Sequence, residues 1–124
     1  MIFIGERINA GFKDIKKAIQ EKDPAAIEKW AKSQTAGGAT YLDVNMGTAS
    51  NKAEDLKWMI ETVQGVTDVP ISIDNNKPAL IKEALSVCKK PPLINSLTAD
   101  EGKLDEMRPL IKEYDASFIG LVMD

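Results

Sequence analysis

The sequence predicts an α/β fold, the N-terminal half of a (β/α)8 TIM barrel with about four βα units and a fifth parallel strand. Short apolar runs alternate with longer segments of helical periodicity, and this alternation implies a parallel sheet with right-handed crossovers. The apolar runs are nearly continuous, as expected for a sheet that is buried on both faces. Most of them end in carboxylate or carboxamide side chains, and barrel enzymes build their sites at these strand ends.

Five apolar runs form the predicted strands. The second run gives the clearest pattern, because Tyr41, Leu42 and Val44 are strand formers. Asp43 and Asn45 are two residues apart and therefore face the same side of an extended strand. The predicted strands lie near residues 2–4, 40–45, 71–73, 93–95 and 117–122, with a loop expected over residues 5–11.

Five helices are predicted between these strands, from apolar residues that recur three and four positions apart. Asp23 suits an N-cap with Pro24 at the first helical position, and Asn51 with Glu54 resembles a capping box. Pro109 is expected to kink or split the last helix. The helices lie near residues 12–19, 24–36, 51–64, 76–88 and 100–114, with Asn75 or Asn76 and Asp100 as the other caps.

Two architectures fit this order of elements, a doubly wound open sheet and part of a barrel. No Gly-x-Gly-x-x-Gly motif follows the first strand and no phosphate loop is present, which weakens the Rossmann and P-loop interpretations. The polar strand ends favour the barrel. A complete barrel needs about 250 residues, so residues 1–124 are expected to form a single partial domain that stops just after its fifth strand.

The composition excludes several classes of function. A net charge of −3 without a basic cluster argues against nucleic acid, and no apolar run approaches the roughly 20 residues of a membrane span. The single cysteine, Cys88, excludes an intrachain disulfide and favours a reducing, cytoplasmic location. The chain has no histidine, which excludes histidine-dependent catalysis and most zinc sites, so we expect no metal bound by this chain.

Several motifs at the strand ends occur in the order of one known family. They are Gly5-Glu6-Arg7-Ile8-Asn9, Gly37-Gly38-Ala39 with Leu42-Asp43-Val44-Asn45, Ile73-Asp74, Ile94-Asn95-Ser96 and Ile119-Gly120-Leu121. Together they resemble the pterin-binding methyltransferases, and in particular the N-terminal half of methyltetrahydrofolate:corrinoid/iron–sulfur protein methyltransferase. Dihydropteroate synthase is a more distant relative. The resemblance covers the whole chain, and its specificity comes from the order of the motifs rather than from any one of them.

The resemblance implies a barrel that binds methyltetrahydrofolate in its C-terminal mouth. It further implies transfer of the N5 methyl group to Co(I) of a corrinoid, or cobalamin, that a partner protein of the corrinoid/iron–sulfur type carries. The family takes further pterin contacts, and an asparagine near N5, from strands six to eight. We therefore expect this chain to be the N-terminal half of such an enzyme, with an incomplete site.

The candidate site residues each have a structural alternative. A carboxylate can accept in parallel from a ring N–H and the adjacent amino group of a pterin, and the resemblance gives Asp74 this role; the alternative is a helix N-cap. Asn95 offers a donor and an acceptor in one side chain, and could instead be a turn residue. Asp43 and Asn45 either form hydrogen bonds to the pterin or to the water network beside its N5 atom, or cap loops at the barrel mouth. The resemblance implies that Asp43 belongs to the hydrogen-bond network of the site. We predict Asn95 and Asp43 as catalytic, and Asp74, Asn95, Asn45 and Asn9 as pterin-binding.

Two rival functions stay open at this point, a non-catalytic half-barrel and a pterin-binding relative of dihydropteroate synthase. The second would need basic residues for phosphate release, and the chain has no convincing set. Half a barrel has two open edges, here Ile2-Phe3-Ile4 and Phe118 to Met123, which carry neither charge nor proline. We therefore expect the chain to pair with a second copy or with a complementary C-terminal half. Arg7 is expected to play a structural role, paired with Glu6 or a neighbouring strand end.

Overall fold

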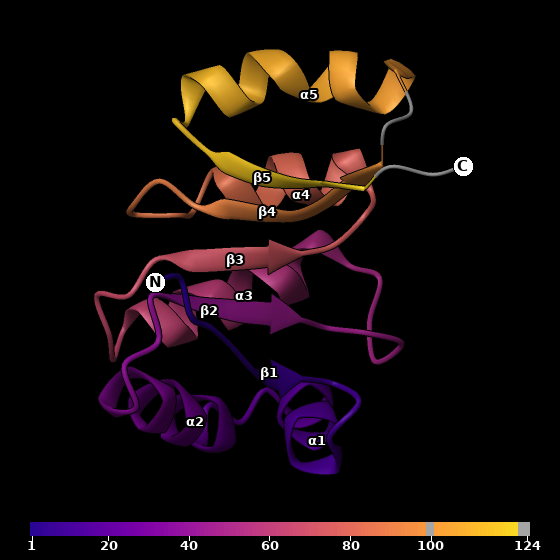
Figure 1. Ribbon diagram of the computed structural model, residues 1–124. Helices are drawn as coiled ribbons and strands as arrows, with labels where there is room; N and C mark the ends of the chain where they lie inside the picture. Colours follow the sequence, from indigo (N-terminus) through magenta and orange to yellow (C-terminus); the bar gives the residue numbers. More distant parts are fainter. Residues whose placement is uncertain (99–100, 122–124) are drawn as a thin grey trace.

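The computed structural model describes residues 1–98 and 101–121 of the chain (Figure 1). Five strands form one sheet in which every neighbouring pair is parallel and the spatial order follows the sequence. A doubly wound sheet reverses its strand order, and no reversal occurs among the described strands. The winding is therefore that of a barrel. The strands are β1 (Ile4–Asn9), β2 (Tyr41–Asn45), β3 (Ile71–Asp74), β4 (Leu93–Thr98) and β5 (Ser117–Leu121).

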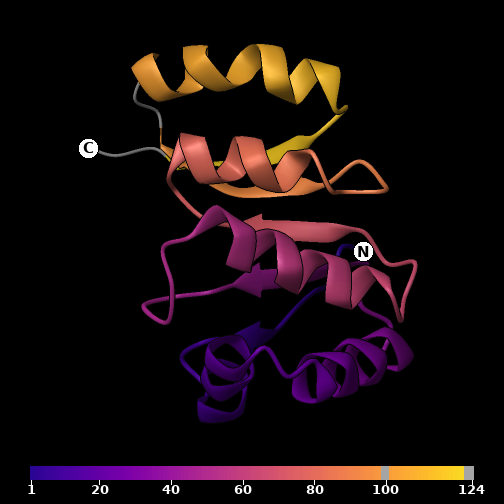
Figure 2. The same ribbon diagram turned by 180° about the vertical axis from the view of Figure 1, so that it is seen from behind.

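The helices lie on one side of this sheet. Figures 1 and 2 show α3 and α4 against the same face of the central strands, with α1 and α2 next to β1 and with α5 next to β5. Among the described residues, no helix lies on the opposite face (Figures 1 and 2), and the barrel is not closed between β1 and β5. Within the described residues, no helix combines the length and the apolar character needed to cross a membrane. The helices are α1 (Lys13–Glu21), α2 (Ala25–Ala36), α3 (Ala53–Gln64), α4 (Pro78–Leu85) and α5 (Glu101–Glu113).

The core fills the layer between strands and helices. Leu42, Val44, Ile73 and Ile94 are fully buried on the helix side of the sheet, where they pack against apolar helical residues such as Ile60. Because side chains alternate along a strand, the residues between them face the other way. This alternation turns the polar residues of β2, β3 and β4 toward the face that the helices leave uncovered.

The predicted first strand was misplaced. The sequence predicts it at residues 2–4 with a loop to residue 11, whereas β1 extends from Ile4 to Asn9 and has an irregularity between Gly5 and Ile8. Ile8 is completely buried, and Asn9 pairs with Asn45 at the end of β2. Pairing with β2 and burial of Ile8 therefore extend the strand, and neither effect is visible in the local sequence.

The helix boundaries follow the predictions with local corrections. α2 begins at Ala25 with Pro24 at the N-cap position, one residue later than predicted, and the Asp23 carboxylate accepts a hydrogen bond from the Ala25 backbone N–H at 3.0 Å. The capping box at the start of α3 does not form, because the hydroxyl of Ser50, rather than Asn51, accepts from the Lys52 backbone N–H at 3.0 Å. The predicted cap at Asp100 lies outside the described residues.

Two further predictions about the helices need correction. Pro109 is predicted to kink or split the last helix; α5 runs from Glu101 to Glu113 as one element that contains Pro109, so the split does not occur. Met107, two residues earlier, is completely buried in the core, and tertiary packing of this kind supplies most of the stability of a helix in a protein. The fourth helix ends at Leu85, so Cys88 lies beyond it, where burial raises the pKa of its thiol to about 12.

Candidate functional site

Four polar side chains come together at the carboxyl ends of the three central strands. Asp43 pairs with Ser72 in the register of β2 and β3, and Asp74 pairs with Asn95 in the register of β3 and β4. Ser72 and Asp74 are two residues apart, so all four side chains lie on the face that the helices leave uncovered. The parallel order of the strands therefore brings the predicted residues Asp43, Asp74 and Asn95 to one place.

Asp43 lies at the centre of this group. The Ser72 hydroxyl donates to its Oδ1 at 2.7 Å, and the Asn95 amide Nδ2 donates to the same oxygen at 3.2 Å. Ser72 is 0% exposed and Asp43 is 2% exposed, so both polar side chains are buried. The carboxyl group is thus held in a fixed orientation by two neighbouring strands.

The environment makes Asp43 an acid that titrates near neutral pH. Burial raises its pKa to about 7, and the neighbouring carboxyl of Asp74 raises the pKa as well. The hydrogen bonds from Ser72 and Asn95 stabilise the carboxylate and oppose this rise. A carboxyl group with a pKa near 7 can take up or release a proton at physiological pH, which suits general acid–base chemistry.

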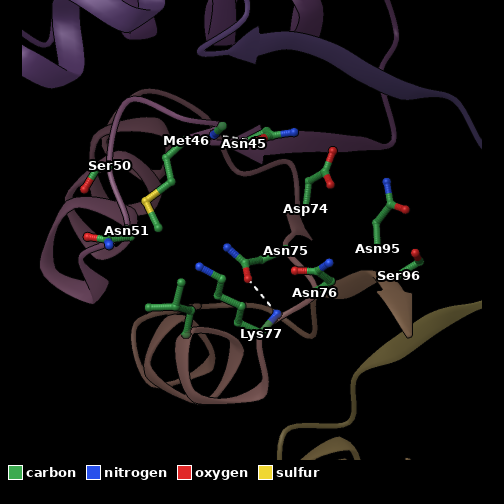
Figure 3. Close-up of a pocket in the computed structure, with 12 residues that line it drawn as sticks. Asn45, Met46, Ser50, Asn51, Asp74, Asn75, Asn76, Lys77, Asn95 and Ser96 are labelled. Atoms are coloured by element: carbon green, nitrogen blue, oxygen red, sulfur yellow. Dashed lines mark hydrogen bonds between the residues drawn. The ribbon is translucent and has the colours of Figure 1, made fainter. Parts of the chain in front are cut away.

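A cavity of about 360 Å³ adjoins Asp74 and Asn95 (Figure 3). One wall is the loop between β2 and α3, and the other is the loop between β3 and α4, which carries Lys77. Figure 3 shows Asp74 and Asn95 next to each other at one end of the cavity. The lining is mostly polar and consists of Asn45, Met46, Gly47, Ser50, Asn51, Asp74, Asn75, Asn76, Lys77, Leu80, Asn95 and Ser96.

Asn45 and Asn9 hold turns with their side-chain oxygens. The Oδ1 atom of Asn45 accepts from the Gly47 backbone N–H at 2.7 Å, and the Oδ1 atom of Asn9 accepts from the Gly11 backbone N–H at 2.7 Å. Asn45 also lines the cavity next to Asp74, whereas Asn9 lines a neighbouring hollow of about 530 Å³ together with Asp43 and Asp74. The Oδ1 atoms of Asn45 and Asn9 thus cap loops, as the structural alternative expects. The Nδ2 atom of each side chain can donate a hydrogen bond to a ligand.

Arg7 has the structural role that the sequence predicts, but with a different partner. Its Nη2 donates to both carboxylate oxygens of Asp14 at 3.0 Å, and the guanidinium carbon lies 3.8 Å from the ring centre of Phe12 and 4.3 Å from that of Trp30. The indole Nε1 of Trp30 donates to the same carboxylate at 2.8 Å. This cluster connects β1 to α1 and α2, so Asp14 takes the place expected for Glu6.

Ser72 is the residue that the sequence analysis missed. It lies between two buried isoleucines in a four-residue strand, two positions before Asp74. Strand alternation alone could have placed its hydroxyl on the same face as Asp74. The register with Asp43 could not have been read from the sequence. Among the described residues, no group of three or more Cys, Asp and Glu side chains could hold a metal ion.

The comparisons with known proteins agree with this geometry. The family model of the pterin binding enzymes matches residues 5–124. The chain belongs to this family. Its members are TIM-barrel proteins, and the open five-stranded sheet follows the same strand order.

Two relatives extend the comparison. The chain is 42% identical over 119 residues to the methylcorrinoid:tetrahydrofolate methyltransferase of Eubacterium limosum, a match that covers 95% of this chain and 44% of that protein. It is 31% identical over 84 residues to an uncharacterized protein of Methanocaldococcus jannaschii, covering 68% of this chain and 15% of that protein. The chain thus spans less than half the length of either relative.

Proposed function

We propose that this chain binds the pterin of tetrahydrofolate and takes part in methyl transfer between its N5 atom and the cobalt of a corrinoid carried by a partner protein. The observation that carries the proposal is the group formed by Asp74, Asn95 and Asp43 at the mouth of a pterin-binding barrel fold. The group offers hydrogen-bond acceptors and an ionisable acid at the place where barrel enzymes build their sites.

Each residue has a chemical role in this proposal. The Asp74 carboxylate accepts from a ring N–H and the adjacent amino group of the pterin, two bonds that fix the plane of the ring. Asn95 binds a second edge of the same ring. Because N5 is a poor leaving group until it gains a proton or a strong hydrogen bond, Asp43 and Asn95 are the catalytic candidates. Asn45 and Asn9 are proposed as further pterin contacts through their amide nitrogens.

The direction of transfer is part of the proposal. The family resemblance implies transfer from methyltetrahydrofolate to Co(I), whereas the name of the Eubacterium limosum relative gives the methylcorrinoid as donor and tetrahydrofolate as acceptor. Both directions pass through the same transition state, so the same side chains serve either one. The partner is proposed to be a corrinoid protein, which supplies the cobalt that this chain does not ligate.

We also propose that the open edges are covered in the working assembly. In the described residues, β1 and β5 each pair on one side only, and Phe3 and Phe118 are 52% and 44% exposed. A second copy of this chain, or a complementary C-terminal half, would cover both edges. Sedimentation velocity at micromolar concentration tests this, and a monomer with a cooperative thermal transition would argue against it.

The central experiment is a binding titration with methyltetrahydrofolate, followed by NMR, of the wild type and of Asp74→Ala. Because part of a barrel wall is open, we expect weak binding. The substitution removes two charge-assisted hydrogen bonds of about 1.5–3 kcal/mol each, so it should weaken binding at least about tenfold. Asp68→Ala is the matched control, since Asp68 is exposed and precedes β3 at the opposite end of the sheet.

The outcome separates the enzyme from its rivals. Equal binding by wild type and Asp74→Ala would refute the pterin role of Asp74. An assay with methylated corrinoid protein and tetrahydrofolate, run also in the reverse direction, tests the transfer itself. Pterin binding without transfer in either direction would favour the non-catalytic half-barrel.

A further inference from the structure

One wall of the polar cavity is held in place by residues that lie behind it. This wall is the loop between β2 and α3, and Figure 3 shows Ser50 and Asn51 on it, with Lys77 on the facing loop. The Ser50 hydroxyl donates to Oδ2 of Asp55 at 2.5 Å and accepts from the Lys52 backbone N–H at 3.0 Å. The wall is therefore connected through one hydroxyl group to the first turn of α3.

Asp55 is the residue to which this wall is attached. It lies in the first turn of α3 and is only 8% exposed. Its Oδ2 accepts from Ser50, while its Oδ1 forms an ion pair with the ammonium group of Lys22. The hydrogen bonds from Lys22 and then from Ser50 hold the pKa of Asp55 below its usual value. Because a buried carboxylate without a cation is costly, Asp55 depends on Lys22 to keep its charge and its position.

Lys22 is in turn fixed by the end of α1. Its φ of 54° is left-handed, and its backbone N–H donates to the carbonyl oxygen of Ala18, which closes the helix. Its ammonium group lies 5.5 Å from the ring centre of Trp58, which follows Asp55 by three residues on the same face of α3. In the described chain the β1–β2 connection contains two helices, α1 and α2, whereas each other connection between strands contains one. The helix α1 therefore ends at the residue that reaches α3.

We propose that Lys22 is a positioning residue for the ligand site, which holds the β2–α3 wall of the cavity through Asp55 and Ser50. Lys22 is not among the described residues that line the cavity, so it acts through these partners and not on the ligand. A wall that is ordered before the ligand arrives favours binding, because the ligand need not order it. The inference rests on the proposed function for the identity of the ligand, and it extends the site to the end of α1.

The first test is amide hydrogen exchange in the free protein, measured by NMR for the wild type and for Lys22→Met. The Lys52 amide reports on the wall, because it donates to the Ser50 hydroxyl. The Lys77 amide donates to Oδ1 of Asn75 at 2.8 Å on the facing loop and is the internal reference. We expect Lys52 to exchange about fivefold faster in Lys22→Met, the effect of one weakened hydrogen bond, and Lys77 to keep its rate. A general loss of stability raises both rates together and is thereby distinguished.

The second test is a titration of the same proteins with methyltetrahydrofolate. The Kd should rise about threefold to tenfold in Lys22→Met, because the ligand must then order the wall as it binds. Lys22→Arg keeps the cation and should restore both the wild-type Kd and the wild-type exchange rate of Lys52. Lys17→Met is the matched control, since Lys17 also lies on α1 but forms an exposed ion pair with Glu21 at 3.9 Å. It should leave both quantities unchanged.

The outcomes separate the inference from the proposed function. Wild-type binding of methyltetrahydrofolate with an unchanged Kd or an unchanged Lys52 exchange rate in Lys22→Met overturns the inference and leaves the proposed function standing. The same holds if Lys22→Arg restores neither quantity. No binding by the wild type overturns the proposed function, and the exchange rates then decide by themselves whether Lys22 holds the wall.

A milder variant keeps the test decisive if Lys22→Met does not fold. Lys22→Gln retains an N–H donor for Asp55 and loses only the charge, and its side chain meets the same left-handed backbone as the wild type. The Kd and the Lys52 exchange rate should change in the same direction as in Lys22→Met, by a smaller factor. Wild-type values of both in Lys22→Gln overturn the inference.

Discussion

Raising the pH from about 4 to about 7 should destabilise the fold, and Asp43 is the reason. Its pKa is about 7 in the folded chain, against an ordinary value of 3.8, because the carboxyl group is buried and lies next to Asp74. Between these two pH values the folded state binds more protons than the unfolded state. The free energy of unfolding therefore falls as the pH rises through this window, and it levels off above the folded pKa.

The size of the effect follows from the shift. One pKa unit corresponds to about 1.4 kcal/mol, so a shift of about three units gives an upper value of about 4 kcal/mol. Part of this shift comes from the neighbouring Asp74 carboxyl, so the burial of Asp43 alone contributes less than this upper value. We expect a loss of about 2–4 kcal/mol, a large fraction of the 5–15 kcal/mol that stabilises an ordinary domain.

The measurement is urea unfolding of the wild type and of Asp43→Asn at several pH values between about 4.5 and about 7.5. The variant has no charge to bury, so its stability should vary much less over this range. Asp68→Asn should keep the wild-type slope, because Asp68 is exposed at the other end of the sheet. Asp55 does not interfere: Lys22 and Ser50 lower its pKa, so its contribution is lost only as the pH falls below about 4. A flat wild-type profile, or the same slope in Asp43→Asn, would refute the reasoning.

Three further predictions concern stability and can be checked by the same unfolding measurement. Arg7→Lys keeps the charge but loses the paired hydrogen bonds and the stacking between two rings, and should cost about 1–2 kcal/mol; an unchanged stability would mean that the cluster does not hold β1. Gly38→Ala should cost about 1 kcal/mol because Gly38 has φ +92°, whereas Gly65→Ala, at φ −69°, should be neutral or slightly stabilising; equal effects would contradict the backbone argument. Ile60→Ala should cost about 2–5 kcal/mol because Ile60 is completely buried between α3 and the sheet, and a loss below about 1 kcal/mol would show that the core there adjusts freely.

The sequence alone was sufficient for the order of elements and for the end of the sheet that carries the site. Apolar periodicity is a local property, so the strands β2 to β5 and the five helices lie close to their predicted positions. The parallel order then places every strand's carboxyl end on one edge, which is why Asp43, Asp74 and Asn95 could be predicted to meet. Apolar pairing with β2 extended β1 beyond its predicted end at residue 4, since that pairing is not a local property.

Only the tertiary structure decided which side chains contact each other within the site. Ser72 donates to Asp43 because β2 and β3 pair in one particular register, and a shift by a single residue would turn Ser72 toward the helices. Arg7 binds Asp14 rather than its neighbour Glu6 because α1 folds back beside β1. Register and helix docking depend on contacts between residues far apart in the chain, which local pattern does not record. The sequence therefore determined which polar groups reach the barrel mouth, and the packing of strands determined how they are oriented there.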